Sequence, residues 1–118
     1  MRLLVVEDEA DLATLLARRL ALKGHDVHVC SDAMQALEVA AAVQPDAILT
    51  DIAMPGMDGW ELARALRARS SEDQFLLVAI SGYQSPEDYA RSAEAGIDYH
   101  LAKPNYFDRL TEILESVS

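Results

Sequence analysis

The sequence predicts an α/β fold with a doubly wound, five-stranded parallel sheet, and three observations lead to this prediction. Short, wholly apolar runs, such as residues 3–6 and 75–80, are typical of strands buried on both faces of a parallel sheet. Segments with apolar residues at helical spacing alternate with these runs. Right-handed crossovers then place helices on both faces of the sheet, and 118 residues fit one such domain.

The first half of the chain contains three predicted strands, at residues 3–6, 27–30 and 47–51. After the first strand, an amphipathic helix is indicated by apolar residues three and four positions apart, and Gly24 is placed to end it. The apolar residues of this helix are Leu12, Leu15, Leu16 and Leu20. Ser31 is predicted to cap an alanine-rich second helix that runs through residue 43 and is closed by Pro45.

The second half begins with a loop over residues 52–59, which contains one proline and two glycines, and a helix over residues 60–69 follows. The fourth strand is predicted over residues 75–80. Pro86 suits the first position of the next helix and Gly96 suits its end. A fifth strand over residues 98–102 and a last helix complete five strand–helix units. That helix contains Phe107, Leu110, Ile113, Leu114 and Val117.

The charge and cysteine content exclude several classes of protein. The chain has 20 acidic and 10 basic residues, a formal charge of -10, so we expect no direct binding to nucleic acid. We expect the arginines at positions 18, 19, 64, 67 and 69 on solvated helix surfaces. The apolar run at the N-terminus is too short for a signal peptide or a membrane span. One cysteine, Cys30, cannot close an internal disulfide, which favours a cytoplasmic protein in which Cys30 packs at a strand end.

Polar side chains follow four of the predicted strands. Glu7 and Asp8 come after the first strand and Asp51 ends the third, at the edge where parallel sheets bind ligands. If these strands are neighbours, three carboxylates meet, and such a site suits Mg²⁺ or Mn²⁺. Ser81 and Lys103 end the fourth and fifth strands and supply a hydroxyl and an ammonium group. This combination fits a phosphoryl group and predicts a carboxylate that accepts phosphate.

Four motifs extend this reasoning. They are Leu-Val-Val-Glu-Asp-Glu at residues 4–9, Asp-Ile-Ala-Met-Pro-Gly-Met-Asp-Gly at 51–59, Ser-Gly at 81–82 and Lys-Pro at 103–104. Their sequences and spacings resemble the response-regulator receiver domains of two-component signalling, over essentially the whole chain. The resemblance implies a flavodoxin-like (βα)5 fold with strand order 2-1-3-4-5, and one receiver domain over residues 1–118.

The resemblance also implies the roles of the residues that handle phosphate. Asp51 is the expected nucleophile and becomes an aspartyl phosphate. Lys103 is expected to pair with one phosphoryl oxygen, and Ser81 to donate its hydroxyl to another. The family also makes the Lys103–Pro104 peptide bond an expected cis bond. Phosphoryl transfer passes through a transition state rich in negative charge. These residues would therefore position the phosphoryl group and neutralise its charge.

The metal site is implied in the same way. Asp8, Asp51 and the backbone carbonyl of Ala53 are expected to ligate Mg²⁺ or Mn²⁺, and Glu7 to act through a bound water. Many receivers have Asp where this chain has Glu7, and the longer side chain is expected to alter the water network around the metal.

Two further departures concern the switch and the phosphoryl lifetime. His100 stands where the family has Tyr or Phe, an aromatic residue that rotates inward when the hydroxyl residue engages phosphate. Our hypothesis is that His100 fills this switch position and makes signalling sensitive to pH; the alternative is a partly exposed histidine without a switching role. Ala53 and Tyr83 occupy positions that influence hydrolysis in the family. Ala53 cannot orient a water, and Tyr83 is bulky enough to obstruct one, so we predict a long-lived phosphoryl group.

The predicted function is therefore a phosphoacceptor signalling switch rather than an enzyme acting on other molecules. A histidine kinase or histidine phosphotransfer protein is the expected phosphodonor. The surface around the fourth helix, fifth strand and fifth helix is expected to contact a downstream protein target or effector domain. A stand-alone regulator, the receiver of a hybrid kinase and the receiver of a larger regulator all remain open as origins, with no effector domain expected after residue 118.

Three other functions stay as alternatives. A haloacid-dehalogenase-type phosphatase also uses an Asp nucleophile with Mg²⁺, but it needs a second Asp where this chain has Ala53. A flavodoxin-like FMN protein needs a phosphate cradle, rich in hydroxyls and glycine, that the first strand–helix loop lacks. A receiver that signals without phosphate conflicts with the presence of Asp8, Asp51, Ser81 and Lys103.

Overall fold

A computed structural model describes residues 1–69 and 75–117, and within them five parallel strands form one sheet in the order β2-β1-β3-β4-β5. The strands are β1 (Arg2–Val6), β2 (Asp26–Cys30), β3 (Ala47–Thr50), β4 (Leu76–Ser81) and β5 (Tyr99–Ala102). The helices are α1 (Ala10–Leu22), α2 (Ala33–Val43), α3 (Gly59–Arg69), α4 (Pro86–Glu94) and α5 (Phe107–Val117). The predicted fold class and strand order are confirmed, with element ends shifted by one or two residues.

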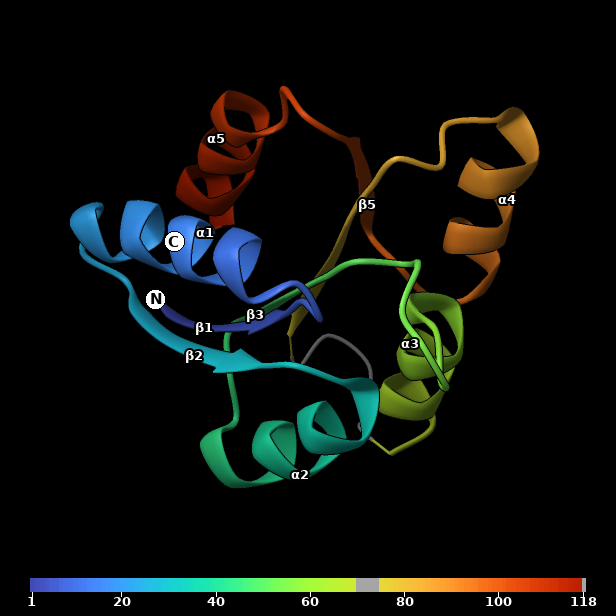
Figure 1. Ribbon diagram of the computed structural model, residues 1–118, viewed down its shortest axis with the longest axis horizontal. Helices are drawn as coiled ribbons and strands as arrows, with labels where there is room; N and C mark the ends of the chain where they lie inside the picture. The colour runs from blue at the N-terminus through green and yellow to red at the C-terminus, as the bar shows by residue number, and fades with distance from the viewer. Residues whose placement is uncertain (70–74, 118) are drawn as a thin grey trace.

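Helices cover both faces of the sheet, as right-handed crossovers require. Figure 1 shows α1 and α5 together on one side and α2 and α3 on the other. Alternate residues of each central strand therefore enter different cores, as period-two geometry requires. Leu4 and Val6 of β1 pack in the core under α2 and α3, while Leu3 and Val5 pack under α1 and α5.

The register of the strands brings the predicted site residues to one edge. Val6 of β1 pairs with Thr50 of β3, so Glu7 and Asp51 directly follow a matched pair. Ser81 pairs with Ala102 of β5, so Lys103 leaves the sheet beside Ser81. Their carboxyl ends point the same way because the strands are parallel.

Turns and caps follow the predicted chemistry at most element ends. Gly24 and Gly96 both adopt φ near +93°, a conformation that glycine accepts without strain. Pro86 begins α4, and the Ser85 side chain accepts a hydrogen bond from the Asp88 N–H in a capping box. Ser31, however, does not cap α2: the cap is Asp32, whose carboxylate accepts from the Gln35 N–H. Both residues are good caps, and α2 begins one residue later than expected.

The apolar face of α1 differs from the prediction. Leu16 and Leu20 are buried with Ala13, but Leu12 and Leu15 are 41% and 57% exposed. The helical spacing is correct, yet two of the four leucines are exposed. These two leucines therefore form an apolar surface next to the carboxyl ends of the strands.

Two of the arginines expected on solvated surfaces have structural contacts. Arg67 of α3 donates hydrogen bonds to the carbonyl oxygens of Gly96 and Phe75 and to the Asp98 carboxylate. The Arg19 guanidinium lies 3.7 Å from the centre of the Phe107 ring, which joins α1 to α5.

Cys30 is buried at the end of β2, as predicted. Among the described residues, no helix is both long and apolar enough to cross a bilayer.

Candidate functional site

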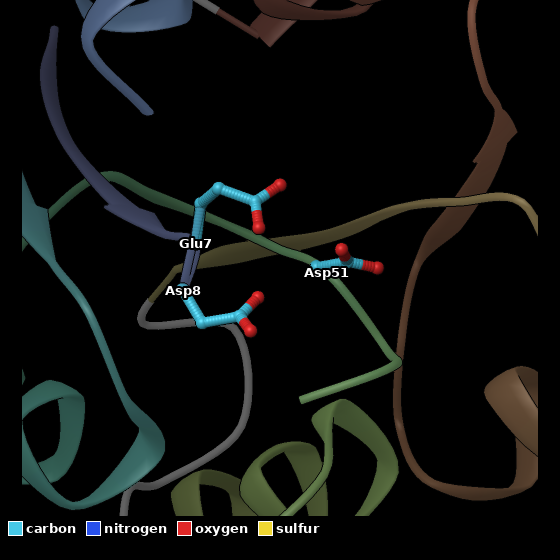
Figure 2. Close-up of side chains that lie close together, drawn as sticks. All are labelled: Glu7, Asp8 and Asp51. Carbon is cyan, nitrogen blue, oxygen red and sulfur yellow. The ribbon is translucent and has the colours of Figure 1, made fainter. Parts of the chain in front are cut away.

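Three carboxylates converge at the carboxyl ends of β1 and β3. Glu7 and Asp8 follow β1 and Asp51 follows β3, and one oxygen from each lies within 4.8 Å of the others. Figure 2 shows the three side chains directed into the same space. Glu7 is 8% and Asp51 9% exposed, while Asp8 is exposed. Solvent can therefore reach this acidic cluster from the Asp8 side.

Asp51 is held through both carboxylate oxygens. Its Oδ1 accepts hydrogen bonds from the backbone N–H of Ile52, at 2.7 Å, and of Ala53, at 3.3 Å. Its Oδ2 accepts from the Lys103 ammonium at 2.9 Å. The loop between β3 and α3 thus fixes one oxygen, and a cation from the loop after β5 fixes the other.

Lys103 bridges two of the three carboxylates. Its Nζ lies 2.9 Å from Asp51 Oδ2 and 3.2 Å from Glu7 Oε1. Burial lowers the pKa of Lys103, but the hydrogen bond and attraction from Asp51, together with Glu7, outweigh burial and raise the pKa above its usual value. The side chain is therefore an ammonium group at neutral pH. Its peptide bond to Pro104 is cis, as the resemblance implied.

Glu7 uses its extra methylene to reach Lys103. Its second oxygen accepts from the Glu9 N–H at 3.2 Å, so the side chain lies between β1 and the ammonium group. Burial raises the pKa of Glu7, and repulsion from Asp51 adds to this effect, while the Glu9 N–H and Lys103 oppose it. An added positive charge beside Glu7 would relieve this repulsion.

Ser81 is fully buried at the end of β4, and its hydroxyl oxygen accepts from the Tyr83 N–H at 3.0 Å. Its carbonyl oxygen accepts from the Lys103 N–H at 2.9 Å. This backbone bond ties the loop after β5 to the end of β4. The serine and the lysine are therefore positioned by one another as well as by the sheet.

An open cavity of about 770 Å³ lies between the loop after β3 and helix α4. Ala53 and Tyr83 both line it, together with Trp60 and Arg91. The Tyr83 ring is 43% exposed, and its centre lies 5.8 Å from that of Trp60. The two residues predicted to influence phosphoryl lifetime thus line the same open cavity.

The hydrogen bonds around His100 involve Ser92, its direct partner, and Trp60, the partner of Ser92, and the sequence analysis identified neither as a functional residue. Its Nδ1 lies 2.7 Å from the Ser92 hydroxyl, which also accepts a hydrogen bond from the Trp60 indole N–H at 2.9 Å. Ser92 is 1% and Trp60 4% exposed. Ser92 is the one buried residue of α4, and a buried hydroxyl needs partners, but no sequence pattern marked it in advance.

A second cavity, of about 360 Å³, reaches the acidic cluster from the opposite side. Leu12 and Leu15 of α1 line it together with Tyr106 and Pro104, and Asp51 and Lys103 line it as well. The exposed leucines of α1 therefore form one wall of a largely apolar approach to Asp51.

The donor set at the acidic cluster fits a small divalent cation. Three converging carboxylates offer hard oxygen ligands with one side open to water, which is how Mg²⁺ is bound in proteins. A cation here would also neutralise the like charges that burial leaves close together. Sequence reasoning predicted this cluster, and the structure brings its three side chains together.

Comparison with known proteins identifies the family. The family model described as Response regulator receiver domain matches residues 3–115. The response regulator MprA of Mycobacterium avium is 34% identical over 110 residues, which are 93% of this chain and 47% of that protein. The chain thus spans about half the length of the curated relatives it matches.

Comparison with solved structures supports the same family. The chemotaxis protein CheY4 of Vibrio cholerae superposes with a TM-score of 0.91 and 26% identity, covering 99% of this chain and 98% of that one. The BeF3-activated receiver domain of Klebsiella pneumoniae RstA gives a TM-score of 0.89 and 30% identity, covering 98% and 96%. TrrA of Thermotoga maritima, solved in complex with Mg²⁺ and BeF, gives 0.86 and 26%, covering 99% and 98%.

Receiver domains are phosphoacceptor signalling switches that bind Mg²⁺ at an acidic pocket. The response regulators that are homologous to this chain act with histidine kinases and effector domains. The matches do not support the haloacid-dehalogenase-type phosphatase kept as an alternative. Sequence match, fold and clustered carboxylates agree, and the chain belongs to the response regulator receiver domain family.

Proposed function

We propose that Asp51 is the phosphoacceptor of this switch and receives its phosphoryl group from the phosphohistidine of a histidine kinase or histidine phosphotransfer protein. The observation that carries the proposal is the contact of Asp51 Oδ2 with the Lys103 ammonium, within a cluster of three carboxylates. A single buried nucleophile is thereby placed between a fixed cation and a set of oxygen ligands. We propose one receiver domain over residues 1–118.

The transfer follows from these contacts. An Asp51 carboxylate oxygen forms the new P–O bond as the P–N bond of the donor breaks, and the imidazole nitrogen of the donor keeps the electron pair. The Ile52 and Ala53 N–H groups orient the nucleophile. Lys103 neutralises charge on the phosphoryl oxygens, and the Ser81 hydroxyl donates to another of these oxygens.

Glu7, Asp8, Asp51 and the Ala53 carbonyl are the residues that would hold Mg²⁺ or Mn²⁺. The bound cation would supply charge neutralisation for the transferring phosphoryl group. Glu7 now pairs directly with Lys103, so its carboxylate is shared between the ammonium group and the metal site. A water between Glu7 and the cation would let the carboxylate keep both contacts.

The phosphodonor is proposed to approach over α1. Leu12 and Leu15 are exposed next to the cavity that leads to Asp51, and an apolar helix face of the donor would cover them. Downstream, the surface of α4, β5 and α5 is proposed to contact a protein target or effector domain. The acidic charge of the chain disfavours direct contact with nucleic acid.

We propose that the only reactions the domain promotes are its own phosphorylation and dephosphorylation, and that dephosphorylation is slow. Ala53 offers no side-chain hydrogen bond to an attacking water, and Tyr83 lines the same cavity as Ala53. Loss of label from phosphorylated Asp51 measures the lifetime. A Tyr83→Ala variant that loses label no faster than the wild type would exclude Tyr83 as the shield.

Phosphoramidate, a small donor with a P–N bond, tests the acceptor chemistry without a cognate kinase. With Mg²⁺, the wild type is expected to gain one phosphate in its intact mass. Lys103→Gln should slow the gain, because removing a cation that contacts Asp51 weakens transition-state neutralisation. Lys23→Gln is the matched control: it removes the same charge from an exposed position at the end of α1, outside the acidic cluster, and should react like the wild type. Equal rates for Lys103→Gln and the wild type would contradict the proposed role of Lys103.

A further inference from the structure

A chain of hydrogen bonds links the buried Trp60 of α3 to the loop after β4. The Trp60 indole N–H donates to Ser92 Oγ at 2.9 Å, and Ser92 Oγ lies 2.7 Å from His100 Nδ1. His100 Nε2 lies 2.7 Å from the Tyr83 carbonyl oxygen. The Tyr83 N–H in turn donates to Ser81 Oγ at 3.0 Å. Residues from α3, α4, β5 and the loop after β4 thus form one connected path to Ser81.

The direction of each bond can be assigned from donor and acceptor chemistry. A carbonyl oxygen only accepts, so His100 Nε2 carries the proton that points at Tyr83. An indole N–H only donates, so Ser92 accepts from Trp60 and has its own proton to give to His100 Nδ1. Every donor has an acceptor when His100 is the neutral Nε2–H tautomer.

We propose that Trp60 and Ser92 are positioning residues that hold His100 as this tautomer and thereby fix the loop next to Ser81. The proposal rests on the proposed function, because it concerns how readily the Ser81 hydroxyl can reach a phosphoryl group on Asp51. Ser92 and Trp60 are almost fully buried, so water cannot easily replace either bond. Trp60 is also covered by the Arg91 guanidinium, 3.7 Å from its ring centre, which holds the indole in place.

Protonation of His100 would reverse one bond of this path. Nδ1 would then become a donor to Ser92 Oγ, and the serine proton would need a new acceptor. Neither partner of the imidazole, the Ser92 hydroxyl or the Tyr83 carbonyl, carries a charge. Proton uptake by His100 therefore requires the Ser92 hydroxyl to turn, which alters the hydrogen bond that Ser92 Oγ accepts from the Trp60 indole N–H.

Other titratable and charged groups lie around the path. From α4 come Tyr89, whose ring centre is 4.4 Å from that of His100, Asp88, which accepts from the Ser85 N–H, and Arg91 above Trp60. From α3 and the start of β5 come Arg67 and Asp98, which form an ion pair at 2.8 Å. Asp88, Arg91, Arg67 and Asp98 each have a partner other than His100, so none of them needs to rearrange when the imidazole is protonated.

The side-chain ¹⁵N–¹H spectrum of the full chain tests the path directly, because the protein has one tryptophan and three histidines. At pH 8, wild-type His100 is expected as the Nε2–H tautomer. On titration to acid, the Trp60 indole resonance is expected to shift with the midpoint of His100 and not with those of His25 or His28. In Ser92→Ala this response of Trp60 should be lost, and Ser92→Thr, which restores a hydroxyl, should recover it.

The outcomes separate this proposal from the proposed function. An Nδ1–H tautomer at pH 8, an indole resonance indifferent to His100, or an equal response in Ser92→Ala would each overturn the path. The same reporter is then followed on addition of Mg²⁺ and beryllofluoride, a phosphoryl mimic. The Trp60 resonance should move in the wild type and at least twofold less in Ser92→Ala. If the mimic has no effect on the wild type, the proposed function fails while the pH titration still decides the path.

Discussion

A methyl group added at Gly59 is expected to destabilise the domain and displace Asp51. Gly59 begins α3, and a Cβ at this position would meet the backbone oxygen of Asp51 and lie 2.7 Å from the Cα of Ile52. Both obstacles are backbone atoms, which cannot turn away as a flexible side chain can. Overpacking of this kind lowers the free energy of unfolding by about 1–3 kcal/mol. Because the clash is with backbone atoms, we expect a loss of about 2 kcal/mol.

Urea unfolding, followed by the fluorescence of buried Trp60 and by circular dichroism, measures this cost. For a slope between about 1 and 3 kcal/mol per molar urea, the loss lowers the midpoint by about 1 M. Gly82→Ala is the matched control, because a Cβ there meets nothing within 4 Å and Gly82 lies outside every helix and strand. A midpoint for Gly59→Ala no lower than that of Gly82→Ala would refute the steric reasoning.

Three further predictions concern stability. Arg67→Met should cost about 2 kcal/mol in the free energy of unfolding, since it removes hydrogen bonds to two carbonyl oxygens and a carboxylate; a loss no larger than that of the exposed Arg64→Met would contradict this. Ser85→Ala should cost about 1 kcal/mol by removing the cap of α4, and an unchanged thermal midpoint would argue against the capping box. Burial, with the nearby amino terminus, lowers the pKa of His25 below 6.5, so the unfolded chain takes up a proton first. Stability should therefore fall as pH drops below about 6.5, and His25→Gln should lose less than the wild type between pH 7.5 and 5.5. An identical loss of stability in His25→Gln and the wild type would contradict that prediction.

Most of the fold was predictable because its signals are local. Apolar runs located the strands, and Gly24, Pro86 and Gly96 marked helix ends at the expected positions. The predicted cap of α2 was wrong because two neighbouring residues are almost equally suitable as caps. Ser31 and Asp32 are both competent caps, and only the path of the chain out of β2 decides between them.

The exposure of α1 could not be predicted from periodicity. Leu12 and Leu16 belong to the same apolar stripe of the sequence, but one is exposed and the other buried. Periodicity places both residues on one helix face, but which turns of that face another element covers is tertiary information. Arg67 is a similar case, because its acceptors Gly96 and Asp98 are distant in sequence.

The acidic cluster was predictable for a topological reason. Parallel strands place all their carboxyl ends at one edge, so Glu7, Asp8 and Asp51 had to meet once β1 and β3 were known to be neighbours. The direct contact between Glu7 and Lys103 needed the structure, since it depends on side-chain reach. The path from Trp60 to His100 also needed it, because three elements that are separate in sequence supply its members.

Peptide mapping of the phosphorylated chain tests the central claim most directly. After reaction with phosphoramidate and Mg²⁺, tandem mass spectrometry should locate one phosphate on the peptide that contains Asp51. The Asp51→Ala variant should show none. A phosphate on another residue, an equal adduct in Asp51→Ala, or no adduct on the wild type would contradict the assignment of Asp51 as the phosphoacceptor.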